Sequence, residues 1–164
     1  MDKQGTIQYA ISGNTCVVRL EGRVTYQQGP AFNTFADSLC GNTSVRSLII
    51  DLRPTTYMDS TILGILAKLS IYSQKALQSR LMVISPNEDI NLILRNSGFD
   101  DVFTLLNHIP PKDEWVSLPL TPPDSKNQAQ VILEAHRALM DLSDENRLRF
   151  SDVVDLLDKE IHHT

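Results

Sequence analysis

The sequence predicts an α/β protein in which short strands alternate with helices. Apolar and polar residues alternate at 7–11 and 15–21, on either side of the turn Ser12-Gly13-Asn14, which indicates a β-hairpin. The segment 48–52 is almost continuously apolar, as expected of a central strand that is buried on both faces. Apolar residues at helical spacing follow both of these segments, so helices are expected to connect the strands.

The first helix is expected at 26–39, after the hairpin. It has an apolar stripe at positions i, i+3, i+4 and i+7, namely Phe32, Phe35, Ala36 and Leu39. Pro30 falls in the first turn, where its missing N–H would be unpaired anyway. Thr25 precedes this helix and is a candidate cap, because its side-chain oxygen can accept from a free backbone N–H.

The middle of the chain continues the alternation. Pro54 follows the strand at 48–52, blocks its continuation and forces a turn before the helix expected at 60–77. The remaining elements of this part are two apolar strands and one helix, expected at 81–85, 102–106 and 87–96. Asn87 or Asp89 is expected to cap that helix. Helices that join parallel strands require right-handed crossovers.

Residues 108–124 contain five prolines and predict a stiff connector that cannot be helical throughout. Apolar residues alternate within it, namely Trp115, Val116, Leu118 and Leu120. They either pack the connector on the main domain or form a docking segment. Packing is favoured, because a single Trp usually anchors its own chain. We therefore divide the chain into a first domain at 1–107, this connector and a helical extension at 125–164.

The extension is predicted to form two amphipathic helices with a break at Leu142-Ser143-Asp144. The expected stripes are Val131, Ala135, Ala138 and Leu142 in the first helix and Phe150, Val153, Val154, Leu157 and Ile161 in the second. Such a hairpin cannot bury both stripes alone, so it should dock on the first domain, self-associate or bind a partner. His162 and His163 are adjacent and do not share a helix face, so no metal site is expected there.

Composition argues against several classes of protein. The chain has 164 residues, 41% hydrophobic and 21% charged, as is ordinary for a soluble domain. The net charge of −5 argues against nucleic-acid binding. No apolar run approaches the roughly 20 residues of a membrane span, and no signal peptide is expected. Cys16 and Cys40 lack CxxC spacing, so they are expected to be reduced thiols of a cytoplasmic protein.

The most specific motif starts where the strand at 48–52 ends. It is Asp51-Leu52-Arg53-Pro54-Thr55-Thr56-Tyr57-Met58-Asp59-Ser60-Thr61-Ile62-Leu63-Gly64. It resembles the signature of STAS domains in the anti-sigma factor antagonist family: an aspartate-leucine strand end, a turn, an aromatic-Met pair, Asp-Ser-Ser/Thr and Gly-Leu-Gly. Ile62 replaces the first of these glycines, and Gly64 is kept. The resemblance covers about 7–107 and implies a small mixed sheet with helices packed mainly on one face.

The resemblance also implies a function, that of an anti-sigma factor antagonist. In such proteins a partner kinase phosphorylates the serine directly after the aspartate, and Ser60 matches it. The unphosphorylated form would bind an anti-sigma factor, phosphorylation would abolish binding, and a protein serine phosphatase would restore it. The kinase would bind ATP, so no cofactor is expected in this chain. The residues expected at the partner surface are Met58, Asp59, Thr61, Ile62, Arg23 and Thr25.

Several of these residues also have a purely structural interpretation. Ser60 could be only a helix N-cap, Thr61 a capping group rather than a second phosphoacceptor, and Met58 a core residue rather than a partner contact. Asp59 is expected to orient the loop and cap the helix, and Ile62 to lie at the partner-facing rim. The switch is favoured for Ser60. The helix dipole lets the fold tolerate a phosphate there, whereas Asp59 and a packed partner surface oppose it.

Catalysis is not expected. A serine or cysteine nucleophile needs a positioned histidine base, and all four histidines lie in or beyond the connector. Gly-x-Ser-x-Gly and P-loop motifs do not occur. Two alternatives stay open. One is an unphosphorylated STAS-like structural subunit of a larger signalling or lipid-transport assembly, and the other is a domain that binds a small ligand.

Overall fold

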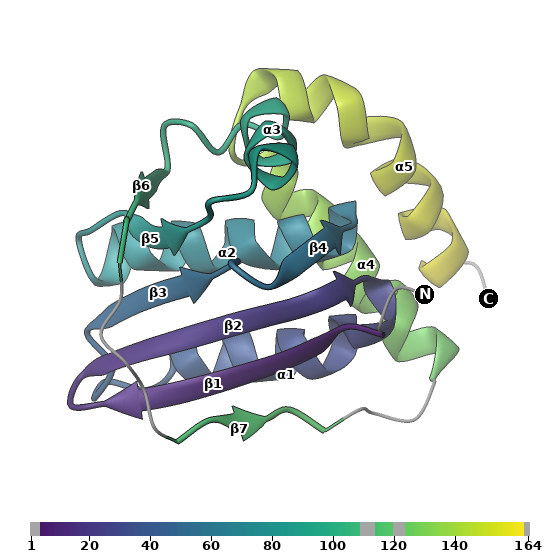
Figure 1. Ribbon diagram of the computed structural model, residues 1–164. Helices are drawn as coiled ribbons and strands as arrows, with labels where there is room; N and C mark the ends of the chain where they lie inside the picture. Colours follow the sequence, from purple (N-terminus) through teal and green to yellow (C-terminus); the bar gives the residue numbers. More distant parts are fainter. Residues whose placement is uncertain (1–3, 109–113, 120–123, 163–164) are drawn as a thin grey trace.

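The computed structural model of the protein describes residues 4–108, 114–119 and 124–162 (Figure 1). Its elements in chain order are β1 (Thr6–Ser12), β2 (Thr15–Val24), η1 (Tyr26–Gln28), α1 (Gly29–Cys40), β3 (Ser47–Asp51), β4 (Thr55–Met58), α2 (Ser60–Ala76), β5 (Leu81–Ile84), α3 (Glu88–Asn96), β6 (Phe103–Leu105), β7 (Val116–Ser117), α4 (Ser125–Met140) and α5 (Asp144–His162). The strands and helices alternate as the sequence predicts.

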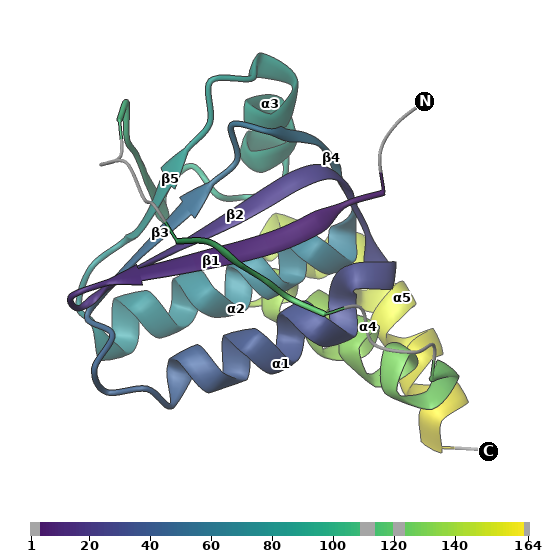
Figure 2. The same cartoon turned by 60° about the horizontal axis from the view of Figure 1, so that its bottom comes forward.

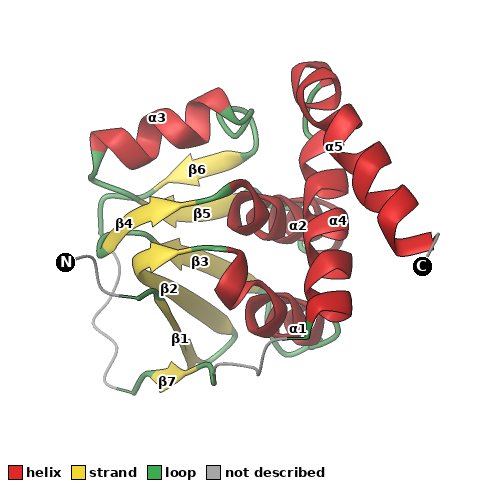
Figure 3. Ribbon diagram, turned by 90° about the vertical axis from the view of Figure 1, so that its right-hand side faces the viewer, coloured by secondary structure: helices red, strands yellow, loops and turns green. Residues whose placement is uncertain are grey.

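The strands form one mixed sheet of seven strands. Its order is β6-β5-β3-β2-β1-β7, and β4 pairs with β2 beside this path. β1 and β2 form the predicted antiparallel hairpin, while β2–β3, β3–β5 and β5–β6 are parallel pairs. Helices α1 and α2 cover one face, α4 and α5 lie outside them, and α3 lies at the β6 end (Figure 3). The predicted fold class is confirmed: α/β, with helices mainly on one face of a mixed sheet.

The main core lies between this face of the sheet and α1 and α2. Its largest fully buried side chains are Phe32, Phe99, Leu20, Leu48, Ile50, Leu52, Ile62, Ile65, Leu66, Leu69, Leu81 and Ile90. Burying a side chain of this size contributes roughly 1.5–3 kcal/mol. The stripe predicted for the first helix points into this core, with Phe32, Ala36 and Leu39 buried and Phe35 half-buried.

Two local predictions differ from the structure. The first helix begins as the separate 3₁₀ turn η1, because Thr25 and Gln28 form a capping box that closes a tight turn before α1. β3 ends at Asp51 and a turn follows at 53–54, as predicted for Pro54, but an additional strand, β4, starts directly after Pro54 and precedes α2. The backbone N–H of Gly22 donates to the Pro54 carbonyl at 2.9 Å, and the Thr55 hydroxyl donates to the Leu20 carbonyl at 2.6 Å. These two bonds hold β4 beside the end of β2.

The connector packs on the sheet where the structure describes it. Trp115 lies on the face opposite the main core, in a second cluster built on Val17, Ile49 and Ile84. β7 pairs antiparallel with β1 (Figure 2), and Leu118 packs against the main core. The packing interpretation is confirmed for Trp115 and Leu118, whereas Val116 is 50% exposed. Leu120 and the prolines Pro110, Pro111, Pro122 and Pro123 lie outside the described residues.

The C-terminal helices form the expected hairpin, and the hairpin docks on the first part of the chain. α4 packs on α1, α2 and α5. Val131 and Ala135 are buried as predicted, together with Leu139. In α5, Val154 is buried as predicted, but the prediction was wrong at Val153, which is 42% exposed, because α4 covers only a narrow side of α5.

Candidate functional site

The start of α2 is held by one carboxylate. Asp59 is the N-cap of α2, and one of its oxygens accepts from the backbone N–H of Ile62 at 3.1 Å. The other oxygen accepts from the backbone N–H of Tyr26 at 2.7 Å. Asp59 therefore joins α2 to the loop that follows β2, as its expected orienting and capping role requires. Ser60 becomes the first residue of α2 in a fixed position.

The Ser60 hydroxyl is not a helix cap, because Asp59 occupies that position. Its Oγ lies 2.9 Å from Nε2 of His136 on α4, 76 residues further along the chain. Nδ1 of His136 lies 2.7 Å from the Ile132 carbonyl, which can only accept. In the neutral imidazole Nδ1 thus carries the proton, and Ser60 donates to Nε2. His136 is 5% exposed and meets the Phe150 ring edge-on.

This pair corrects one step of the sequence argument. Catalysis was excluded partly because every histidine lies far from Ser60 along the chain, yet the docked hairpin brings His136 within hydrogen-bond distance of it. The distance matches that of a nucleophile and its base. The imidazole is oriented by the Ile132 carbonyl, however, where a catalytic triad places a carboxylate.

The residues expected at the partner surface divide into two groups. Arg23 is exposed, and Thr25 and Asp59 are half-buried around Ser60. Met58, Thr61 and Ile62 are only 2%, 4% and 0% exposed. The rim position expected for Ile62 was wrong, because the first turn of α2 packs into the main core and this side chain points inward. Met58 likewise occupies the core position that was the alternative for it.

Sequence reasoning missed two exposed aromatic side chains near Ser60. Tyr26 is 43% exposed in η1, beside its backbone contact to Asp59. Tyr57 is 36% exposed, and the Arg23 guanidinium lies 4.0 Å above its ring. Tyr57 belongs to the aromatic-Met pair of the motif, so a signal for it was present. Tyr26 and His136 had none, because only the folded chain brings them to this place.

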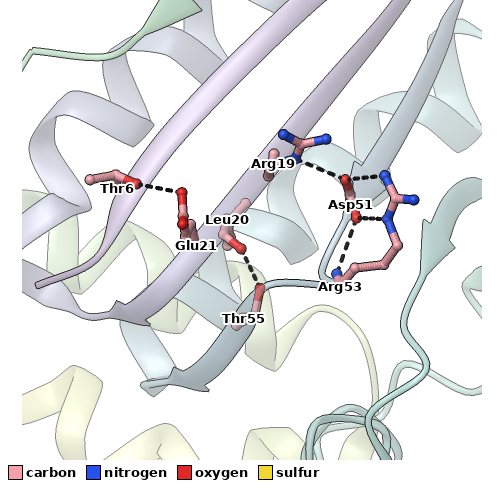
Figure 4. Close-up of polar contacts among 7 residues, drawn as sticks. All are labelled: Thr6, Arg19, Leu20, Glu21, Asp51, Arg53 and Thr55. Carbon is pink, nitrogen blue, oxygen red and sulfur yellow. Dashed lines mark hydrogen bonds and ion pairs between the residues drawn. The ribbon is translucent and has the colours of Figure 1, made fainter. Parts of the chain in front are cut away.

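A charge cluster built on the buried Asp51 holds the turn that leads to the site (Figure 4). Asp51, at the end of β3, is 0% exposed and accepts from Nε of Arg19 at 3.0 Å and from Nε and Nη2 of Arg53, both at 2.9 Å. Burial by itself would raise the pKa of Asp51, but the hydrogen bonds from Arg53 and Arg19 outweigh it, so the net pKa is lowered. The ionised carboxylate fixes the path from β3 to β4.

Three further features bear on the kind of site. No group of three or more His, Cys, Asp or Glu side chains within 4–108, 114–119 and 124–162 is arranged to hold a metal ion. None of the helices built from those residues is long and apolar enough to cross a membrane. Cys16 and Cys40 are both free, the first buried and the second half-buried.

Fold and site together define a small α/β domain that presents a serine at the start of a capped helix. The chain belongs to the STAS domain family, whose model matches residues 6–111. The match includes all of β1 to β6 and the whole Ser60 motif. Among curated proteins, none matches this chain.

Solved structures of anti-sigma factor antagonists share this fold, and three are compared in turn. The anti-sigma factor antagonist SpoIIAA in its unphosphorylated form is 15% identical, with a TM-score of 0.52 over 63% of this chain and 89% of that one. SpoIIAA of Bacillus in the phosphorylated form is 17% identical, with a TM-score of 0.51 over 62% of this chain and 91% of that one. An anti-sigma factor antagonist from Mycobacterium paratuberculosis is 21% identical, with a TM-score of 0.55 over 65% of this chain and 88% of that one. At these identities the likeness shows the fold.

Proposed function

We propose that this protein is an anti-sigma factor antagonist controlled by reversible phosphorylation of Ser60. Its unphosphorylated form binds an anti-sigma factor or a kinase of the partner-switching type in a bacterial cytoplasm. The kinase phosphorylates Ser60 and ends binding, and a protein serine phosphatase restores it. The phosphorylated unit is the proposed STAS domain at 1–107, to which the connector at 108–124 attaches the helices of 125–164.

The observation that carries this proposal is the position of Ser60. It is the first residue of α2, directly after Asp59, and Asp59 rather than Ser60 caps the helix. The side chain is half-buried, and its hydroxyl contacts the His136 side chain rather than capping the helix backbone. Thr61 is a poorer phosphoacceptor, because it is only 4% exposed. A phosphate on Ser60 would add about −1.5 to −2 charges beside Asp59 at the surface that the partner contacts.

The contact surface that we propose consists of the exposed groups around Ser60. They are Arg23, Thr25, Tyr26, Tyr57 and Asp59. Tyrosine and arginine are enriched among the residues that dominate binding energy, and here Arg23 stacks on Tyr57. Met58, Thr61 and Ile62 support this surface from beneath.

The test combines phosphopeptide mapping with a pull-down. Protein isolated from its own cells in several growth phases should carry phosphate on Ser60. Ser60→Ala should retain a partner that Ser60→Asp loses. Ser44→Asp is the matched control, because Ser44 is exposed in the turn that precedes β3, whereas Ser60 follows the other end of β3, and the variant should retain the partner. Absence of phosphate in every condition, with a partner indifferent to both changes at Ser60, would refute the proposal.

A second candidate function is an unmodified structural subunit of a larger assembly. One observation favours it: α5 exposes large apolar side chains, with Leu148 at 83%, Leu156 at 61% and Val153 at 42%. Exposed apolar side chains clustered on one helix often mark a contact with another protein. Light scattering of the purified chain and of Leu148→Glu separates the two functions. A stable oligomer that Leu148→Glu dissociates, in a chain never phosphorylated at Ser60, would favour the subunit.

We also propose that the chain is not an enzyme, and the Ser60–His136 pair makes this testable. A fluorophosphonate reagent labels serines that a neighbouring base activates. We expect Ser60 to remain unlabelled, because His136 is buried beneath α5 and its Nδ1 faces the Ile132 carbonyl where a triad has a carboxylate. Labelling that Ser60→Ala and His136→Ala each abolish would contradict this.

A further inference from the structure

We infer that the outer face of α1 and α2 next to Ser60 is a receptor for an α-helix, and that α4 of the same chain already occupies it. The inference rests on the proposed function in one respect, that a partner contacts the chain at Ser60. It adds that the partner binds through an α-helix. It also adds how the site is regulated, because the α4–α5 hairpin must move before a partner or a kinase can reach Ser60.

The first argument is the place of α4 in the molecule. Figure 3 shows α4 crossing the outer side of α1 and α2, as a third layer outside the sheet and its helices. Its inward residues Val131, Ala135 and Leu139 lie at i, i+4 and i+8 and are 4%, 3% and 0% exposed. This is how an amphipathic helix occupies a groove, with anchors one turn apart on its apolar side.

The second argument is the close approach of α4 to α2. A Cβ placed on Gly64 would overlap the carbonyl of Ala135 and come within 2.6 Å of its Cβ. Gly64 lies inside a regular helix, where glycine is less favourable than alanine. Gly64, which belongs to the motif, therefore costs α2 some stability but permits the crossing, because only small residues let two helix backbones touch.

The third argument is the polar contact next to that crossing. Ser60 donates to Nε2 of His136 at 2.9 Å, while Nδ1 of His136 is satisfied by its own helix. Ser60 therefore has no room for a phosphate in the direction of His136. A helix that binds here in place of α4 needs a small residue opposite Gly64 and a hydrogen-bonding side chain opposite Ser60. A tethered helix competes at an effective concentration of about 1 mM.

The experiment uses the purified, unphosphorylated full chain and amide hydrogen exchange read by mass spectrometry. Gly64→Ala adds a methyl group on α2 that overlaps the backbone of Ala135, and Ala135→Glu places a large charged side chain on α4 against Gly64. We expect each to speed exchange of α4 by about tenfold or more and to expose the start of α2, while β2 and β3 keep their protection. Gly41→Ala is the control, because its Cβ would meet only Asp37 and Ser38 oxygens at 3.8 Å. His136→Ala, a milder change, should give an intermediate effect.

A synthetic peptide of residues 124–142 then tests the receptor directly. At about 1 mM, the tethered concentration, it should restore protection to the start of α2 in the Ala135→Glu chain, whose receptor is intact. It should give no protection to Gly64→Ala, whose receptor lacks the room.

Three results would overturn the inference. They are α4 exchange unchanged in both variants, loss of β2 and β3 protection together with α4, and no protection of Ala135→Glu by the peptide. None depends on a kinase. A chain never phosphorylated at Ser60 would refute the proposed switch alone, and a closed hairpin in a phosphorylated chain would refute this inference alone.

Discussion

The Ser60–His136 hydrogen bond should have a measurable coupling energy between α2 and α4. A typical intramolecular hydrogen bond contributes about 0.5–1.5 kcal/mol net. The contact is 2.9 Å long, and His136 is 5% exposed, so water cannot reach Nε2 freely. Ser60 is half-buried, which lets water replace part of the contact. A coupling of about 1 kcal/mol follows.

The single changes should cost more than the coupling itself. Ser60→Ala leaves a buried ring nitrogen without a donor, at about 1–3 kcal/mol. His136→Ala also removes the edge contact to Phe150 and leaves a cavity, at about 2–4 kcal/mol. The double variant should be less destabilised than the sum of the two by about 1 kcal/mol, because the second change removes a group whose partner is already gone.

Urea denaturation of the four proteins, followed by helical circular dichroism, measures these free energies of unfolding. Ser44→Ala, at an exposed position, is the control and should stay within about 0.5 kcal/mol of the parent. If the two changes add within about 0.3 kcal/mol, the hydroxyl and the imidazole do not interact. The account of how α4 is held over Ser60 would then be wrong.

Three further predictions concern buried polar groups. Asp51→Asn should destabilise the chain by about 2–3 kcal/mol at pH 7, because two guanidinium groups lose their buried carboxylate. The pKa of Asp51 is lowered on folding, so its contribution is present above the unfolded value of about 3.9 and is lost as the pH falls through the folded value. If urea denaturation gave the same loss of stability for Asp51→Asn at pH 7 and at pH 3, the lowered pKa of Asp51 would be contradicted. Burial raises the pKa of the Cys16 thiol to about 12 and also raises the pKa of the Cys40 thiol. A disulfide reagent at pH 8 should therefore label the half-buried Cys40 slowly and the buried Cys16 only after unfolding. Equal labelling rates in the native protein would exclude this. Asn146→Ala should lower the free energy of unfolding by about 2–3 kcal/mol, because the Asn146 amide donates to the buried carbonyls of Ser97 and Leu139 at 2.8 and 2.9 Å. Thermal unfolding measures this loss, and an unchanged transition would show that these bonds do not anchor the hairpin.

The α/β class could be predicted because it depends on local patterns. The alternation at 7–11 and 15–21 and the continuous apolar segment at 48–52 specify strands wherever they occur in a chain. The start of α2 was also predictable, since Asp59 caps the helix with its own side chain. The pattern nevertheless left Ser60 and Thr61 open as alternative caps beside Asp59. Only the backbone geometry distinguishes them.

β4 and β7 were missed because they depend on neighbours rather than on their own residues. Each is short, and each exists only because a longer strand offers it hydrogen bonds. Pro54 has no N–H, but its carbonyl still accepts from Gly22, so the pairing resumes one residue later. Ile62 was misplaced for a related reason. Its exposure depends on how α2 is tilted into the core, which the motif does not contain.

The sequence by itself determined the alternation of strands and helices, the capped start of α2 and the family to which Ser60 points, because these depend on side-chain period and on residues close together in the chain. The tertiary structure alone decided what Ser60 faces. Its hydroxyl meets His136 across 76 residues, through a helix whose docking requires a glycine on one side and an alanine on the other. Contacts of this kind arise from the packing of two surfaces, and neither surface specifies the other in the local sequence.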